Sequence, residues 1–199
     1  TEILGHVNDP GVDILSIVRA YGLPEAFSKD IMRAAEKVPE TVPEELIARR
    51  AAHDFRNLPT VTIDGEDSKD LDDAVSLEYD EASHQYRLYV HIADVSEYVT
   101  EHSLIDQEAL NRGTSVYLTD RVIPMLPRVL CNGICSLNPG EDRLTLSCIM
   151  DMDESGKILS HELCESVIRS DKRMTYSGVH AVLTGTTLTN GENIEDYLP

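Results

Sequence analysis

The chain has 199 residues, of which 41% are hydrophobic, enough to bury the core of one domain, or of one domain plus a fragment. Its 36 acidic and 17 basic residues give a formal net charge of −19, which argues against a general nucleic-acid binder because phosphate contacts depend on lysine and arginine. Two interpretations remain. Either the partner is not nucleic acid, or the site holds cations that invert the local field while the basic surfaces lie elsewhere.

The sequence lacks the marks of membrane insertion and export. No apolar run approaches the ~20 residues of a transmembrane helix, and residues 1–7 lack the basic start and apolar core of a signal peptide. We therefore expect a soluble, cytoplasmic protein with no membrane partner. The four cysteines do not have the spacing of a zinc site, so we expect them to be buried reduced thiols.

The first 58 residues predict short helices that form a connecting segment and not an independent core. Gly22 and Pro24 stop the first stretch with apolar residues at helical spacing. Ser28 is placed to cap a second helix, and Pro43 to start a third. The three helices are predicted at residues 12–21, 28–38 and 44–52.

From Thr60 onward the pattern changes to short runs with β-type residues. Polar turns at residues 80–85 and 153–156 separate two pairs of such runs, which predicts two hairpins. Strands are predicted at residues 61–63, 74–79, 86–92, 115–118, 143–152 and 157–169, and helices at residues 103–112 and 176–183. We expect an α+β (mixed α/β) fold: a mixed, largely antiparallel sheet with hairpins, flanked by helices.

Six acidic residues crowd into ten positions between the first two strands. They are Asp64, Glu66, Asp67, Asp70, Asp72 and Asp73, and only Lys69 offers a positive charge within the run. Two like charges 4 Å apart cost about 1 kcal/mol in water and about 4 kcal/mol at an effective dielectric of 20. A hard divalent cation such as Mg²⁺, Mn²⁺ or Ca²⁺ is the natural neutralising partner. The alternative is a solvated acidic turn, which is what most acidic runs are.

The spacing limits how these carboxylates can converge. Asp64 closes a strand, and Gly65 permits a sharp turn after it. Asp70 and Asp72 project to the same side of an extended chain, whereas Asp73 projects oppositely unless the chain bends. The spacing of the EF-hand calcium loop does not fit. Composition alone does not say which metal is bound, or whether the metal is catalytic.

Residues 62–75, Thr-Ile-Asp-Gly-Glu-Asp-Ser-Lys-Asp-Leu-Asp-Asp-Ala-Val, resemble the signature of the catalytic domain of the ribonuclease II/ribonuclease R family. The likeness continues through residues 92–96, 111–117, 122–127 and 135–139. Residues 9–16 resemble the linker of ribonuclease R in particular. The resemblance implies a division into the tail of an OB-fold (cold-shock-like) domain at residues 1–7, a helical linker at 8–58 and the N-terminal part of the catalytic domain at 59–199.

The resemblance implies a 3′-to-5′ exoribonuclease that degrades single-stranded RNA and releases nucleoside 5′-monophosphates. In this family four aspartates hold magnesium, for which Mn²⁺ can substitute, and they match Asp64, Asp70, Asp72 and Asp73. We expect Asp70 and Asp72 to be catalytic, with Asp72 the residue whose loss stops chemistry while binding persists. Two ions can activate water and stabilise the leaving 3′-oxygen.

The resemblance also suggests RNA contacts outside the acidic run. Tyr117 matches an aromatic residue that stacks on a base near the cleavage point, and the alternative is a strand tyrosine packed in the core. Arg112 is a candidate phosphate contact, and the alternative is an ion pair at the surface. We expect His91 to be a hydrogen-bonded core histidine and Asp94 to be structural support near the site.

The chain lacks the later family stretch of the form T-[ST]-P-[IL]-R-R-Y, whose paired arginines are expected to grip phosphates. We therefore expect the 199 residues to be inactive or very weak alone, and any association with ribosomes or the RNA-decay machinery to depend on domains outside them. Two other functions stay open. One is a non-catalytic cation-binding or protein-interaction module, and the other is a different magnesium-dependent phosphohydrolase.

Overall fold

The computed structural model describes residues 2–186, which form two compact units. The described part of unit 1 comprises residues 2–38 and 98–130, and that of unit 2 comprises residues 39–97 and 131–186. The predicted linker of residues 8–58 therefore contributes to both units. The predicted domain boundaries themselves stay predictions.

Unit 1 is mainly helical. Its elements are α1 (Val12–Ala20), α2 (Lys29–Ala35), α4 (Leu104–Arg112) and a two-stranded hairpin of β4 (Val116–Tyr117) and β5 (Val122–Ile123). Helix α2 packs against α4. The hydroxyl of Ser103 accepts a hydrogen bond from the backbone N–H of Asp106 at the start of α4, and Gly113 (φ 73°) ends this helix in the left-handed conformation that glycine adopts without strain.

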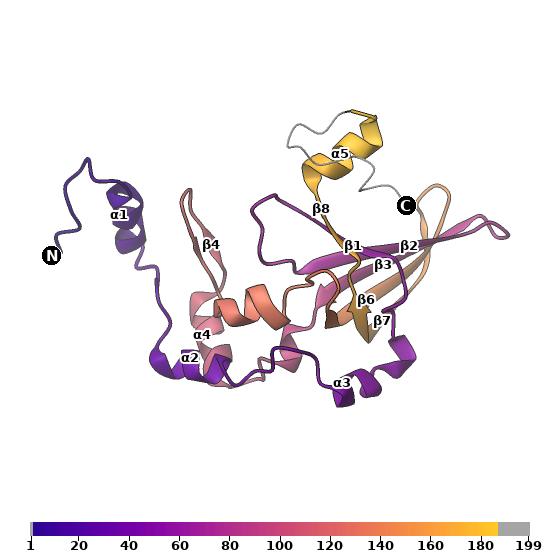
Figure 1. Ribbon diagram of the computed structural model, residues 1–199, viewed down its shortest axis with the longest axis horizontal. Coiled ribbons are helices and arrows are strands. Elements are labelled where there is room, and N and C mark those ends of the chain that lie inside the picture. The colour runs from indigo at the N-terminus through magenta and orange to yellow at the C-terminus, as the bar shows by residue number, and fades with distance from the viewer. Residues whose placement is uncertain (1, 187–199) are drawn as a thin grey trace. The chain divides into compact units, whose positions relative to one another are not determined.

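Unit 2 is built on a six-stranded sheet in the order β7-β6-β3-β2-β1-β8 (Figure 1). The strands are β1 (Thr60–Asp64), β2 (Asp73–Asp80), β3 (Gln85–Ala93), β6 (Asp142–Asp153), β7 (Ile158–Arg169) and β8 (Lys172–Thr175). The helices of this unit are α3 (Glu44–Arg49) and α5 (Tyr176–Thr184), with 3-10 turns at Ala51–His53 and Val95–Glu97. A π-helical turn, Leu130–Ile134, lies where the chain passes from unit 1 to unit 2.

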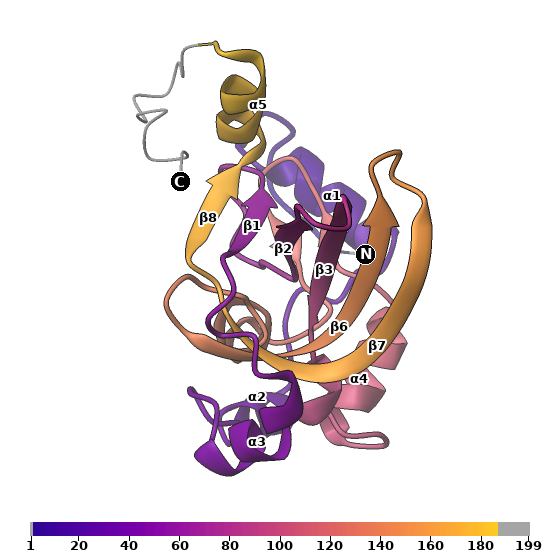
Figure 2. The same ribbon diagram turned by 90° about the vertical axis from the view of Figure 1, so that its right-hand side faces the viewer.

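All neighbouring strands of the sheet are antiparallel except the last pair. The hairpins β2–β3 and β6–β7 form where the polar turns predicted them, and Figure 2 shows β6 and β7 as a long curved pair at one edge. Strand β8 joins the other edge in parallel with β1, with Thr62 opposite Arg173 and Asp64 opposite Thr175. The long connection from β1 to β8 thus returns the chain to the strand that precedes the acidic run.

A chain of buried polar side chains crosses five strands of the sheet. Thr60 on β1 hydrogen-bonds Ser76 on β2 (2.7 Å), and Ser76 hydrogen-bonds Nε2 of His91 on β3 (3.2 Å). The Nδ1 atom of His91 contacts the hydroxyl of Ser147 on β6 at 2.6 Å, and Ser147 contacts Ser166 on β7 at 2.5 Å. All five side chains are buried. Each of these polar groups therefore has a hydrogen-bond partner within the sheet in place of water.

An apolar cluster packs in the same unit. It consists of Leu71, Ala74, Ala93, Leu137 and Ile168, with Phe55 packed against it. Leu71 is 3% exposed although it stands between acidic residues. Because this leucine is buried, the acidic run is anchored to the core and is not a free surface turn.

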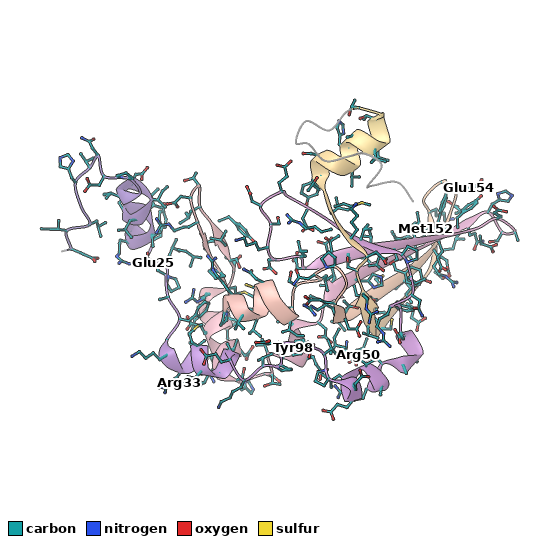
Figure 3. The ribbon with its side chains drawn as sticks, viewed as in Figure 1. Glu25, Arg33, Arg50, Tyr98, Met152 and Glu154 are labelled. Atoms are coloured by element: carbon teal, nitrogen blue, oxygen red, sulfur yellow. The ribbon has the colours of Figure 1, made fainter. Side chains whose placement is uncertain are left out.

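Arg50 carries a buried positive charge beside the end of β3 (Figure 3). Its Nη2 atom lies 2.5 Å from Oδ2 of Asp94 and 3.0 Å from a carboxylate oxygen of Glu97, and its Nη1 atom donates to the carbonyl oxygens of Thr145 and Ser166. Burial works against ionisation of Asp94, but hydrogen bonds from Ser96 and Arg50 outweigh it and hold the pKa of Asp94 below its ordinary value.

The predicted fold class is confirmed, as are the two hairpins and the helix pattern, with two differences. Three predicted helices end earlier than expected, at residues 20, 35 and 49, and β5 and β8 were not predicted. All four cysteines are free thiols; Cys131 and Cys135 are buried, and Cys148 and Cys164 are half-buried. Across residues 2–186 we find no helix with the length and apolar character to span a bilayer.

The position of His91 makes a prediction about pH. Burial lowers the pKa of His91 from 6.5 to about 4, so the unfolded chain binds a proton on this residue at a higher pH than the folded chain does. Stability contributed by the neutral imidazole is present above about pH 6.5 and is lost as the pH falls towards 4, by up to about 3 kcal/mol.

Urea unfolding of the wild type and His91→Asn between pH 4 and 7.5 checks this prediction. The stability difference between the two proteins should shrink as the pH falls, because only the wild type loses this contribution. Parallel curves would contradict the assignment.

Candidate functional site

The acidic loop, residues 64–73, runs from the end of β1 to the start of β2. At its entry, Nη2 of Arg173 on β8 donates to the carbonyl oxygens of Gly65 (2.7 Å) and Glu66 (2.6 Å). The backbone N–H of Ser68 closes a turn onto the carbonyl of Gly65 at 3.1 Å. The first half of the loop is therefore tied to the neighbouring strand by a side chain that lies more than 100 residues later in the sequence.

The second half of the loop is held from the segment before β6. The hydroxyl of Ser136 accepts from the backbone N–H of Leu71 (3.1 Å) and donates to the carbonyl of Lys69 (3.2 Å). The N–H of Leu137 donates to the carbonyl of Leu71 at 2.8 Å, and the N–H of Ala93 donates to the carbonyl of Asp72 at 2.9 Å. These contacts and the burial of Leu71 fix the main chain from which Asp70 and Asp72 project.

The loop gathers negative charge. Burial raises the pKa of Asp70 to about 6, with the charges of Asp72 and Asp64 adding to the effect. Burial also raises the pKa of Asp64, Asp72 adds to it, and Arg173 opposes it. Partial burial and the charges of Asp72 and Asp64 raise the pKa of Asp73, although its side chain stays accessible. The four predicted aspartates therefore share one electrostatic site.

The chemistry of this site fits a divalent cation in donor type and charge. Asp64 is 7% exposed, and its Oδ2 atom is buried with no hydrogen-bond partner among the described residues. A buried carboxylate oxygen without a partner is costly unless a cation or a proton occupies it. Within residues 2–186, however, no three His, Cys, Asp or Glu side chains are already arranged to hold a metal ion. The metal role of these aspartates stays a prediction.

The two predicted RNA contacts lie in unit 1 and have different surroundings. Tyr117 on β4 is 71% exposed, so its ring is not packed in a core as the alternative required. Arg112 has a side chain only 2% exposed; it lies over the ring of Phe27 and pairs with Glu108 at 2.8 Å. Its guanidinium also donates to the carbonyl oxygens of residues 24, 26 and 124. This geometry favours a structural role for Arg112 and disfavours its predicted contact with phosphate, which stays a prediction.

Sequence reasoning missed two residues that shape the site, Ser136 and Arg173. Ser136 lies within residues 135–139, one of the stretches that carry the family resemblance, but the sequence predicted no role for it. No sequence signal pointed to Arg173, because the strand that presents it was not predicted. His91 is a hydrogen-bonded core histidine, as predicted. Asp94, which was predicted as structural support near the site, forms a buried ion pair with Arg50 that the sequence did not predict.

The sequence profile of the RNB domain matches residues 52–197, which include the whole acidic loop. The chain belongs to the RNB domain family. The resemblance to the ribonuclease II/ribonuclease R family is thereby confirmed. A cold shock domain profile matches residues 1–28, upstream of the RNB domain.

Relatives of this RNB chain include ribonuclease R proteins from several bacteria. Ribonuclease R 1 of Lactococcus lactis subsp. lactis is 48% identical over 98% of this chain and 24% of its own length. Ribonuclease R of Thermotoga maritima is 48% identical over 92% of this chain and 26% of its own length. RNase R of Mycoplasma genitalium, solved in complex with ribose methylated single-stranded RNA, matches with a TM-score of 0.86 and 33% identity over 100% of this chain and 30% of that chain. The chain thus spans about a quarter of the length of the curated relatives.

The crowding of charge predicts how Asp70→Asn changes stability. The ionised carboxylate is disfavoured in the metal-free fold, so its removal should raise the free energy of unfolding at pH 7.5 by on the order of 1–2 kcal/mol, after allowance for solvent screening. Addition of Mg²⁺ or Mn²⁺ should stabilise the wild type more than the variant, because the variant has lost a ligand.

Asp67→Asn is the matched control, since Asp67 lies in the same loop, is exposed and is not among the four predicted ligands. Its stability should change by less than about 0.5 kcal/mol. Equal metal-induced stabilisation of the wild type and Asp70→Asn, measured by chemical denaturation, would contradict a ligand role for Asp70.

Proposed function

We propose that this chain carries the metal-binding part of a 3′-to-5′ exoribonuclease that hydrolyses single-stranded RNA to nucleoside 5′-monophosphates. The observation that carries the proposal is the acidic loop of the RNB domain: four aspartates share one electrostatic site on a main chain held at both ends. The names of the relatives, and the RNA bound to the Mycoplasma genitalium protein, support RNA as the substrate.

We further propose that Asp64, Asp70, Asp72 and Asp73 hold Mg²⁺, with Mn²⁺ as a substitute. Bound divalent ions would supply an activated water and stabilisation of charge on the phosphate and the leaving oxygen. Among the described residues no three such side chains are already arranged to hold a metal, so a bound cation would have to offset the repulsion between the carboxylates as they converge on it. The unpartnered Oδ2 atom of Asp64 supports this residue as one of the ligands.

Tyr117 is proposed to stack on a base of the RNA. An aromatic face binds any base, which suits an enzyme that must accept every sequence. The exposure of the ring supports this role. The net charge of −19 is compatible with RNA binding only if bound cations, or basic surfaces beyond these residues, offset the repulsion between the loop and phosphate.

The proposed activity predicts that Asp72→Asn abolishes degradation while RNA binding persists. In the protein that carries this chain, 5′-labelled single-stranded RNA should be shortened from its 3′ end when Mg²⁺ is present and left intact with a chelator. Asp72→Asn should lower the rate by at least about 10²-fold, because a metal ligand of the transition state is lost.

Asp67→Asn, in the same loop, should retain the wild-type rate to within a few fold. Full activity of Asp72→Asn, or of the wild type in excess chelator, would overturn the proposed mechanism. Shortening from the 5′ end would overturn the proposed polarity.

The proposed stacking role makes a separate prediction for Tyr117. Tyr117→Ala should weaken binding of single-stranded RNA by about 1–3 kcal/mol, because a base loses its aromatic partner, and Tyr117→Phe should restore most of it. Fluorescence anisotropy with labelled RNA and the degradation-deficient background measures the effect. Equal affinities for the alanine variant and the wild type would exclude Tyr117 as a stacking platform.

A further inference from the structure

We propose that Arg173 is the positioning residue of the acidic loop, acting by closing the loop entry through its main chain. The inference rests on the proposed metal-binding function of that loop. The guanidinium reaches the loop through the main chain. Its Nη2 atom donates to two consecutive backbone carbonyls, those of Gly65 and Glu66, at 2.7 and 2.6 Å.

These two hydrogen bonds fix the segment directly after Asp64. The carbonyl of Gly65 also accepts from the N–H of Ser68, so Arg173 and the turn meet at one oxygen atom. Loss of the arginine would leave the carbonyl of Glu66 without this donor and would free the chain between Asp64 and Ser68. Asp64, whose Oδ2 atom has no hydrogen-bond partner among the described residues, is the last residue of β1 before this segment.

Arg173 is itself delivered by a rigid element. Its strand pairs in parallel with β1 over four residues, from Val61 opposite Lys172 to Asp64 opposite Thr175. Thr175 ends the strand and caps α5, accepting a hydrogen bond from the N–H of Gly178 at 3.0 Å. The guanidinium therefore approaches the loop from a strand fixed along one side by β1 and at its end by a helix.

If Arg173 acted on the proposed metal site only through its charge, it would weaken metal binding and would not support it. The guanidinium of Arg173 lies against the carbonyls of the two residues that directly follow Asp64. A cation beside a cation site repels a divalent ion, and its removal should then strengthen metal binding. A positioning residue should do the reverse, because groups that orient metal ligands typically contribute 10–100-fold in metal affinity. Whether metal affinity falls or rises when Arg173 is replaced therefore distinguishes a positioning role from electrostatic repulsion.

The test compares Arg173→Met, Arg173→Lys and the control Arg87→Met in the full chain. Arg87 lies on β3 and pairs with Asp151 through a side chain that is 53% exposed, so its substitution removes the same charge away from the loop. Circular dichroism and thermal unfolding confirm that each variant is folded. Two readouts follow: amide hydrogen exchange of residues 65–70 without metal, and Mn²⁺ affinity from electron paramagnetic resonance.

In Arg173→Met, exchange at residues 65–70 should rise on the order of ten-fold and Mn²⁺ should bind roughly ten-fold more weakly. Arg173→Lys, which keeps the charge and can still donate to a carbonyl, should recover part of both losses. Arg87→Met should leave both readouts unchanged. If Arg173→Met fails to fold, Arg173→Lys still tests the proposal, because a positioning role requires this variant to show faster exchange at residues 65–70 and weaker Mn²⁺ binding than the wild type.

Tighter Mn²⁺ binding in Arg173→Met, or unchanged exchange at residues 65–70, would overturn the proposal. If the wild type binds no Mn²⁺ at all, the proposed metal function fails, while the exchange measurement still reports whether Arg173 holds the loop.

Discussion

The buried pair of Arg50 and Asp94 connects the helical segment before the sheet to the strands that carry the acidic loop. The two side chains are 2% and 3% exposed, and removal of one partner of such a pair typically costs 3–5 kcal/mol because the other charge is left buried. Asp94 follows β3 and its N–H donates to the carbonyl of Leu144 on β6. One residue earlier, the N–H of Ala93 donates to the carbonyl of Asp72. The main chain of Asp72, the proposed catalytic aspartate, is therefore connected to this buried ion pair through Ala93.

Polar side chains make up a large part of the interior of unit 2. A small apolar cluster lies beside a row of hydroxyls and one imidazole that crosses five strands. Such a network is stabilising only when every member has a partner, and it then specifies one register for each strand. This register sets where β1 ends and β2 begins, and so sets the two ends of the acidic loop. The rigid framework and the electrostatically strained loop are complementary, since repelling carboxylates stay together only on a scaffold that resists them.

Much of this arrangement is local in the sequence, and that part was predictable. The β-type runs at residues 143–152 and 157–169 on either side of a polar turn predicted the β6–β7 hairpin, and the helix predicted at residues 103–112 matches α4. The acidic loop was evident because six carboxylates with one lysine need a neutralising partner. Strand β8 was not evident: four residues are too short for a periodic pattern, and their pairing with β1 is set by tertiary contacts. For the same reason the sequence offered Arg112 as a phosphate contact, although its partners come from carbonyls far along the chain.

The parallel pairing of β8 with β1 has a consequence for synthesis on the ribosome. The donor on Arg173 and the acceptors at Gly65 and Glu66 are separated by 108 and 107 residues of chain. At a translation rate of roughly 5–20 residues per second, Arg173 is made about 5–20 s after residues 65 and 66, so the loop lacks the two hydrogen bonds from Arg173 during this time. During this interval the nascent chain carries a dense run of negative charge with only part of its final support. Divalent ions in solution are the counter-charges available at that stage. Hydrogen exchange on stalled nascent chains can show whether ion binding precedes or follows the docking of β8.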